Sequence, residues 1–128
     1  VPELHIANRT RSRAEAFREE FGQRIIVQDW VQAGNMIEGA ATVVNASSLG
    51  MVGKPEMRVP LDGFSRHAVA CDLVYTPLET KFLKAAREQG CRVVDGLGML
   101  LFQAAPGFER WFGKKPEVDE DLRQAALS

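Results

Sequence analysis

The sequence predicts an α/β fold built on a doubly wound, mainly parallel sheet. Five short apolar runs rich in β-branched residues alternate with segments in which apolar residues recur at helical spacing. This alternation indicates strands joined by crossover helices. The run Ala41–Ala46 is largely apolar, which is typical of a buried parallel strand. The 128 residues, 45% of them hydrophobic, suffice for one domain with its own core.

The first three strands are predicted in the N-terminal part of the chain. Gly22 ends the first helix as a C′ residue, and Asp29 is the expected cap of a weak second helix. The predicted elements are, in order, strand His5–Ala7, helix Arg11–Phe21, strand Arg24–Val27, a weak helix from Asp29 to Gly39, and strand Ala41–Ala46.

The remaining elements follow a segment, residues 51–66, that its prolines and glycines predict to be a long loop. Thr76-Pro77-Leu78-Glu79 has the pattern of a capping box with proline at the first helical position. We expect strand His67–Val74, a helix from Thr76 to Gly90, strand Cys91–Asp95, a turn at Gly96–Gly98 opening a long apolar helix to Phe112 that Pro106 kinks, and a short helix from Pro116.

Composition excludes several classes of protein. A formal net charge of −1 lacks the electrostatic footprint of a nucleic-acid-binding or membrane-surface protein, and no apolar run approaches the length of a membrane span. Cys71 and Cys91 lack the spacing of a metal or redox site and predict buried free thiols in a reducing cytoplasm. His5 and His67 are isolated, so we expect no metal site.

A strand-to-helix junction near the N-terminus predicts a phosphate site. Arg9, Arg11 and Arg13 surround it, Thr10 or Ser12 is available as the N-cap, and the positive end of the helix dipole points beyond the strand. The same residues are equally compatible with a solvated, basic helix start.

The absence of an acid at this junction indicates which dinucleotide would bind. Folds that prefer NAD place a carboxylate at the end of the second strand to accept from the ribose 2′-hydroxyl, whereas an arginine accommodates a 2′-phosphate. No carboxylate lies between Glu3 and Glu15, and Asn8 stands at that position beside Arg9. We therefore expect NADP in preference to NAD.

Further polar residues follow the other predicted strands. Ligands of open parallel sheets bind at the carboxyl ends of the strands, so a cofactor is expected there. The residues at these ends are Asn8, Asn45, Ser47, Ser48, Asp72, Tyr75, Asp95 and Gly96.

Four blocks of sequence resemble shikimate dehydrogenase, specifically its C-terminal, Rossmann-like NADP-binding part. The first block alone is shared with other reductases, whereas the last two together are specific. The blocks are Asn8-Arg9-Thr10 with Arg13; Asn45-Ala46-Ser47-Ser48-Leu49-Gly50-Met51; Asp72-Leu73-Val74-Tyr75-Thr76-Pro77 with Thr80; and Asp95-Gly96-Leu97-Gly98-Met99-Leu100 with Gln103-Ala104-Ala105.

The resemblance implies a role for each block. The 2′-phosphate would be held by Asn8, Arg9, Thr10 and Arg13; the dinucleotide path would be lined by Ala46, Ser47 and Ser48; the nicotinamide side would be contacted by Leu73, Gly96 and Met99; and the substrate would be reached by Tyr75 and Gln103. The reaction implied is reversible NADPH-dependent reduction of 3-dehydroshikimate to shikimate in aromatic amino-acid biosynthesis.

Two parts of the family pattern are missing. The first βα unit with its Gly-rich loop is not found, and the family's catalytic Lys and Asp belong to an N-terminal substrate domain that is also not found. We therefore expect a fragment of a larger enzyme, with an NADP-binding domain over residues 1–112 and a helical extension over 113–128. By itself it should be inactive and bind NADP weakly.

The fragment is expected either to close its first strand onto its third or to self-associate through bare sheet edges. Other readings stay open for the function. They are a related reductase of the quinate dehydrogenase or glutamyl-tRNA reductase type, and a non-catalytic module that senses NADP or scaffolds a partner.

Overall fold

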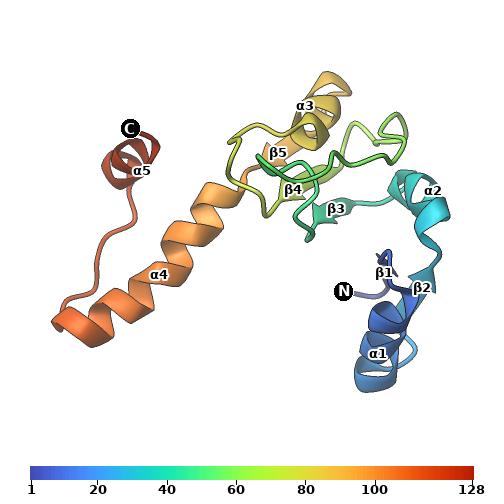
Figure 1. Cartoon of the computed structure of the whole chain (residues 1–128), viewed down its shortest axis with the longest axis horizontal. Helices are drawn as coiled ribbons and strands as arrows, with labels where there is room; N and C mark the ends of the chain where they lie inside the picture. Colours follow the sequence, from blue (N-terminus) through green and yellow to red (C-terminus); the bar gives the residue numbers. More distant parts are fainter.

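The five strands are parallel but form two separate sheets (Figure 1). The computed structural model describes residues 1–128. β1 (Leu4–Ala7) pairs with β2 (Ile25–Gln28), and β3 (Thr42–Asn45), β4 (Val69–Asp72) and β5 (Arg92–Val94) form the second sheet in that order. The α/β class with parallel pairing is confirmed.

The expected closure of β1 onto β3 is wrong, because no ladder joins these two strands. Each sheet packs against its own helix and has its own apolar cluster, and the two clusters share no residue. Pairing β1 with β3 would require these two units to merge. Both strands therefore retain an unpaired inner edge.

The N-terminal unit consists of β1, β2 and helix α1 (Arg11–Phe21). Ala14 on α1 is buried against Ile25 and Val27 of β2. Gly22 ends the helix with φ +86°, a conformation that other residues rarely adopt. The predicted helix and its C-terminal glycine are confirmed.

The larger core lies between the second sheet and helix α3 (Lys81–Glu88). Phe64 and Phe82 meet edge to face with ring centroids 5.5 Å apart. Residues 51–66 form no helix or strand, as predicted, yet Phe64 belongs to this core. The cluster comprises Ile37, Phe64, Ala68, Ala70, Phe82, Leu83, Ala86 and Cys91.

The weak second helix is a 3-10 turn, η1 (Trp30–Gln32), followed by α2 (Ala33–Ile37). Asp29 precedes η1 but makes no side-chain cap. The helix buries Ile37 in the larger core, so tertiary packing rather than capping holds it.

Two predicted helix starts are wrong. α3 begins at Lys81 rather than at Pro77, because Thr80 is the N-cap residue and its hydroxyl accepts from the Leu83 amide. α5 (Glu120–Leu127) begins after Asp119 rather than at Pro116, since the Asp119 side chain accepts from the Leu122 amide.

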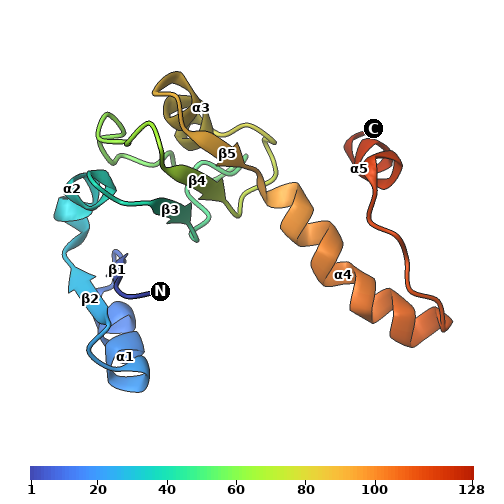
Figure 2. The same ribbon diagram turned by 180° about the vertical axis from the view of Figure 1, so that it is seen from behind.

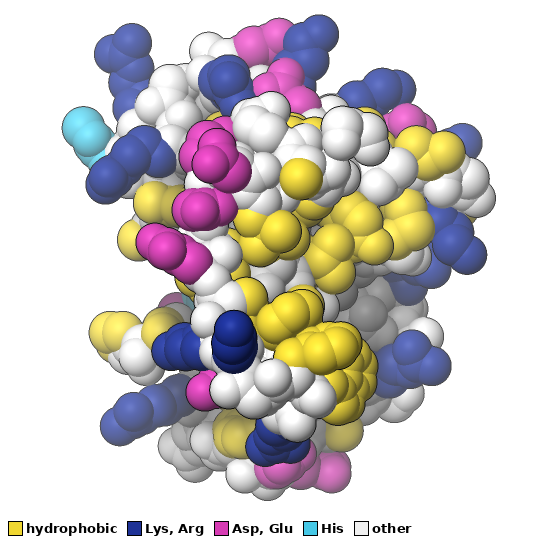
Figure 3. All heavy atoms as spheres, turned by 90° about the vertical axis from the view of Figure 1, so that its left-hand side faces the viewer, with side chains coloured by type: hydrophobic (Ala, Val, Ile, Leu, Met, Phe, Trp, Pro, Cys, Tyr) yellow, Lys and Arg dark blue, Asp and Glu magenta, His cyan; other side chains and the backbone are white.

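Helix α4 (Gly96–Phe112) leaves the end of β5 and extends away from both sheets, and α5 turns back beside it (Figures 1 and 2). The expected turn at Gly96–Gly98 is already the first helical turn, and α4 continues through Pro106. Phe102, Trp111 and Phe112 are exposed on α4. Figure 3 shows the face of the molecule that lies on the left-hand side of Figure 1, and hydrophobic side chains gather in a broad patch on this face. None of the helices has the length and apolar character of a membrane span.

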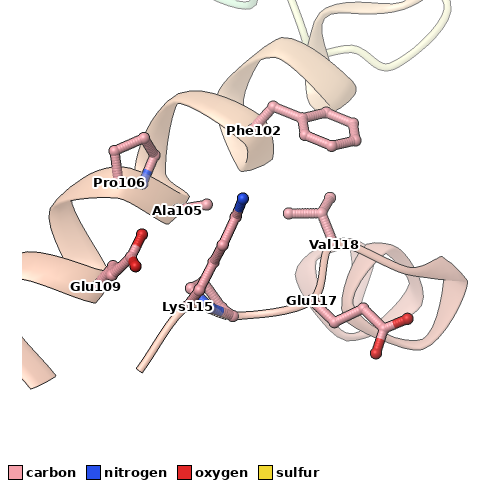
Figure 4. Close-up of a pocket in the computed structure, with 8 residues that line it drawn as sticks. Phe102, Ala105, Pro106, Glu109, Lys115, Glu117 and Val118 are labelled. Atoms are coloured by element: carbon pink, nitrogen blue, oxygen red, sulfur yellow. The ribbon is translucent and has the colours of Figure 1, made fainter. Parts of the chain in front are cut away.

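A pocket of about 450 Å³ lies between α4 and the segment that leads to α5. Phe102 and Val118 line one part of it, and the Lys115 side chain points toward the space between Ala105 and Val118 (Figure 4). None of the residues expected to bind cofactor or substrate lines this pocket.

Candidate functional site

The junction between β1 and α1 presents two guanidinium groups without ion-pair partners. Arg9 and Arg13 are exposed and form no ion pair. The Asn8 amide donates to the Thr10 carbonyl at 2.8 Å, which fixes the turn between strand and helix. Thr10 occupies the N-cap position, but its hydroxyl makes no capping bond and is free for a ligand.

Arg11 differs from its two neighbours. Its Nε donates to Glu15 at 3.1 Å, and its Nη1 pairs with Asp29 at the end of β2. The hydrogen bond to Asp29 raises the pKa of the Arg11 guanidinium above its ordinary value. The predicted phosphate site therefore contains two free cations rather than three.

A buried polar network joins the ends of β3 and β4. Asp72 is fully buried, and its Oδ1 accepts from the Asn45 amide at 3.0 Å and from the Val74 backbone at 2.9 Å. Its Oδ2 accepts from the Thr80 hydroxyl at 2.6 Å. These donors satisfy a carboxylate that burial would otherwise destabilise.

This network changes the expected role of two strand-end residues. The sequence predicts Asn45 and Asp72 among the residues that line the cofactor site, but both side chains are buried and hydrogen-bonded to protein. The Asn45 Oδ1 accepts from the Ser47 hydroxyl at 2.7 Å, so it orients that residue. Ala46, Ser47 and Ser48 themselves are exposed at the end of β3.

Gly96 is required for the close approach of α4 to the end of β4. A Cβ at this position would lie 2.4 Å from the Leu73 carbonyl oxygen and 2.7 Å from that of Val74. The first turn of α4 and the Leu73 backbone are therefore in direct contact. Leu73 and Gly96, both expected on the nicotinamide side of the site, are thus in contact.

The residues expected to meet substrate, Tyr75 and Gln103, and the cofactor residue Met99 are exposed. Met99 follows Gly96 by three residues and Gln103 follows Met99 by four, so the three lie on one face of α4. Both are exposed, and Tyr75, in the loop after β4, has 43% of its surface exposed.

Cys71 lies on β4 next to this edge and is a partly buried free thiol, whereas Cys91 is buried. Burial raises the pKa of the Cys71 thiol above its ordinary value of 9.0, and the carboxylates of Asp72 and Asp95 raise it further. Its environment thus keeps the thiol protonated.

Sequence reasoning missed three residues that support the site. Thr80 caps α3 and holds Asp72, Asp29 occupies Arg11, and Arg123 on α5 pairs with Asp95. Thr80 follows the Asp72–Pro77 block that carries the family resemblance, and this block was the available signal. The other two contacts join residues too far apart in sequence for any local pattern to indicate them.

Comparison with known proteins confirms the resemblance. Residues 96–127 match the family described as "Shikimate 5'-dehydrogenase C-terminal domain". A Paracoccus denitrificans protein named "Shikimate dehydrogenase (NADP(+))" is 66% identical over all 128 residues, which are 45% of its length. A Cereibacter sphaeroides protein of the same name is 64% identical over 46% of its length. The chain thus spans about half the length of the curated relatives it matches.

Solved structures agree on the Rossmann-like fold. Quinate dehydrogenase from Corynebacterium glutamicum in complex with NAD superposes with a TM-score of 0.85 at 31% identity, over 99% of this chain and 46% of that one. Shikimate 5-dehydrogenase from Thermus thermophilus in complex with NADP(H) and shikimate gives 0.75 at 36% identity, over 90% and 42%.

Proposed function

We propose that this chain is the NADP-binding part of a shikimate dehydrogenase, which interconverts 3-dehydroshikimate and shikimate. The observation that carries the proposal is the pair of free guanidinium groups, Arg9 and Arg13, on a chain 66% identical to an NADP-dependent shikimate dehydrogenase. A planar cationic fork matches a 2′-phosphate, and the segment between Glu3 and Glu15 contains no carboxylate to accept from a ribose 2′-hydroxyl.

The residues present fit the adenosine end of NADP. Arg9 and Arg13 would pair with the 2′-phosphate, while Asn8 shapes the turn and the free Thr10 hydroxyl would donate to it. Ala46, Ser47 and Ser48, exposed at the end of β3, would line the path toward the nicotinamide.

The other end of the site would bring cofactor and substrate together. Leu73, Gly96 and Met99 would contact the nicotinamide, which supplies the hydride chemistry when bound. The Tyr75 hydroxyl and the Gln103 amide would hydrogen-bond the hydroxyls or carboxylate of the substrate, because a cyclic polyol needs neutral donors and acceptors at fixed angles. We assign no proton-transferring residue to this chain.

We further propose that a substrate-binding part completes the site. The curated relatives are about twice as long as this chain, which leaves room for one. The division at residues 112 and 113 and a cytoplasmic location belong to the same proposal, and the two free cysteines are compatible with a reducing compartment.

The test is a kinetic comparison in the full-length protein, with NADPH formation from NADP⁺ followed for shikimate and for quinate. We expect shikimate to be preferred. Tyr75→Phe and Gln103→Ala should each raise KM for shikimate about tenfold while leaving KM for NADP⁺ unchanged, because each removes a contact to substrate only.

Gln124→Ala is the matched control, since Gln124 is an exposed amide on α5 that bonds only to Glu120. A higher kcat/KM for quinate would favour the quinate dehydrogenase alternative. No turnover of either compound would contradict the proposal.

A further inference from the structure

Arg123 makes the side-chain hydrogen bonds that join α5 to the start of α4. Every other residue of α5 is exposed, and the helix buries no apolar side chain. The Arg123 Nη1 donates to Asp95 Oδ1 at 3.2 Å, and its Nη2 pairs with Asp95 Oδ2. This ion pair therefore links α5 to the residue that precedes α4.

The geometry distinguishes the Arg123–Asp95 pair from an ordinary surface ion pair. Exposed ion pairs with a single hydrogen bond contribute little to stability, because solvent screens the charges and both side chains lose conformational freedom. Here both carboxylate oxygens are engaged by one guanidinium fork, and the two side chains are only 26% and 25% exposed. Bidentate pairs of this kind fix orientation as well as charge.

The same carboxylate caps α4. Asp95 Oδ1 accepts from the Leu97 amide at 3.1 Å, which satisfies a donor in the first turn of that helix. Arg123 thus holds the capping group of α4 from a second helix.

The capped turn is the part of α4 that packs against β4. Gly96 contacts the Leu73 carbonyl with no room for a side chain, and Met99 and Gln103 lie on the same face of α4. A rotation of Asp95 would therefore move these groups relative to the strand ends. The adenosine end of the site lies on the other sheet and would not move.

We propose that Arg123 is a positioning residue, which holds Asp95 so that the α4 face carrying Met99 and Gln103 is correctly placed at the nicotinamide end of the cofactor site. This inference rests on the proposed function.

The experiment compares two ligands in the full-length protein. NADPH occupies both ends of the site, whereas 2′,5′-ADP carries only the adenosine end with its 2′-phosphate. Their dissociation constants are measured for the wild type, Arg123→Met, Arg123→Lys and Arg110→Met. Arg110 is the matched control, because it is an exposed arginine of α4 outside every ion pair. Amide exchange at Leu97 is followed in parallel.

Arg123→Met should weaken NADPH binding about tenfold and change 2′,5′-ADP binding less than about twofold. Arg123→Lys keeps the positive charge but lacks the guanidinium fork, so its affinity for NADPH should lie between those of the wild type and Arg123→Met. The Leu97 amide should exchange about fivefold faster in Arg123→Met. Arg110→Met should match the wild type throughout.

Equal weakening of both ligands would indicate a general loss of structure and would overturn the proposal. Unchanged NADPH binding or unchanged Leu97 exchange would overturn it too. If the wild type binds neither ligand, the proposed function fails instead, and Leu97 exchange in Arg123→Met still decides whether Arg123 holds the cap.

Discussion

Gly96 shows how a single missing methyl group sets the position of a helix. Its α-carbon faces the Leu73 and Val74 carbonyls at the end of β4, and a Cβ there would come within 2.4 Å of an oxygen. Gly98, two residues later in the same turn, has no atom within 4 Å of its equivalent position. A comparison of substitutions at Gly96 and Gly98 therefore distinguishes the effect of close packing from the effect of helix propensity.

Gly96→Ala should lower the free energy of unfolding by about 1–3 kcal/mol, because backbone atoms must move to admit the methyl group. Gly98→Ala should be neutral or raise it by up to about 1 kcal/mol, since alanine favours the helix. Urea unfolding of both variants checks this. Equal effects would show that the contact with Leu73 does not constrain α4.

The Cys71 thiol supplies a prediction about pH. Its pKa is raised in the folded state, so the folded protein holds the thiol proton more tightly than the unfolded chain does. This stabilisation is present below the ordinary thiol pKa and is lost as pH rises through the folded value. Unfolding free energies measured between about pH 8 and about pH 10 should fall more steeply in wild type than in Cys71→Ser. A Cys91→Ser variant should retain the steeper fall.

Arg11 illustrates what could be predicted at this scale. The number of arginines near the phosphate site, and the lack of a carboxylate close in sequence, were evident from the chain. That Arg11 is already paired was not, because its partner Asp29 lies eighteen residues away on another strand. Burial of Asp72 was likewise hidden, since a strand-end carboxylate can face either the ligand or the core.

At the scale of elements, α3 is capped by the residue that also holds the buried carboxylate. Thr80 donates to Asp72 and accepts from the Leu83 amide at 3.3 Å. The local pattern favoured Thr76 instead, because Thr76-Pro77-Leu78-Glu79 fits a capping box with proline at the first helical position. The choice between the two threonines was made by tertiary contact with Asp72, which local rules do not include.

Thr80→Val should therefore lower the free energy of unfolding by about 2 kcal/mol, since it leaves a buried acceptor and a helix amide without partners. Thr76→Val should change it by less than about 0.5 kcal/mol, because Thr76 is exposed and its hydroxyl makes no hydrogen bond. Chemical denaturation separates the two. A larger loss of unfolding free energy in Thr76→Val than in Thr80→Val would contradict this prediction and indicate that Thr76 caps α3.

The periodic elements were the most predictable. The span of α1 and its closing glycine, the three strands of the second sheet and the extent of the long loop followed from hydrophobic pattern and turn residues. The start of α5 did not follow, because Pro116 and Asp119 are both acceptable beginnings. Asp119 prevails by accepting from the Leu122 amide.

At the scale of the whole molecule, two sheets with unpaired inner edges expose backbone groups that can pair with another chain. We expect the 128-residue chain by itself to associate at micromolar concentration. Val44→Lys places a charge on β3, where Val44 is 52% exposed, and should reduce the association. Val31→Lys, at an exposed position outside the strands, should not. A concentration-independent monomer in sedimentation would contradict this prediction.

The same separation divides the candidate site into two parts. The β1–α1 unit carries the free arginines, whereas the second sheet and α4 carry the residues expected near the nicotinamide. The adenosine end should therefore decide between NADP and NAD without help from the other end. This division is the reason that mutations in the two parts are expected to have different consequences.

The most direct measurement is the affinity of the full-length protein for NADPH and NADH, in wild type and in two arginine variants. We predict tighter binding of NADPH, and a loss of about tenfold or more in Arg9→Met with NADH binding unaffected. Arg11→Met should lose less NADPH affinity than Arg9→Met, because Arg11 is already paired with Glu15 and Asp29. Equal affinity for the two cofactors in wild type, or an unchanged preference in Arg9→Met, would contradict the account.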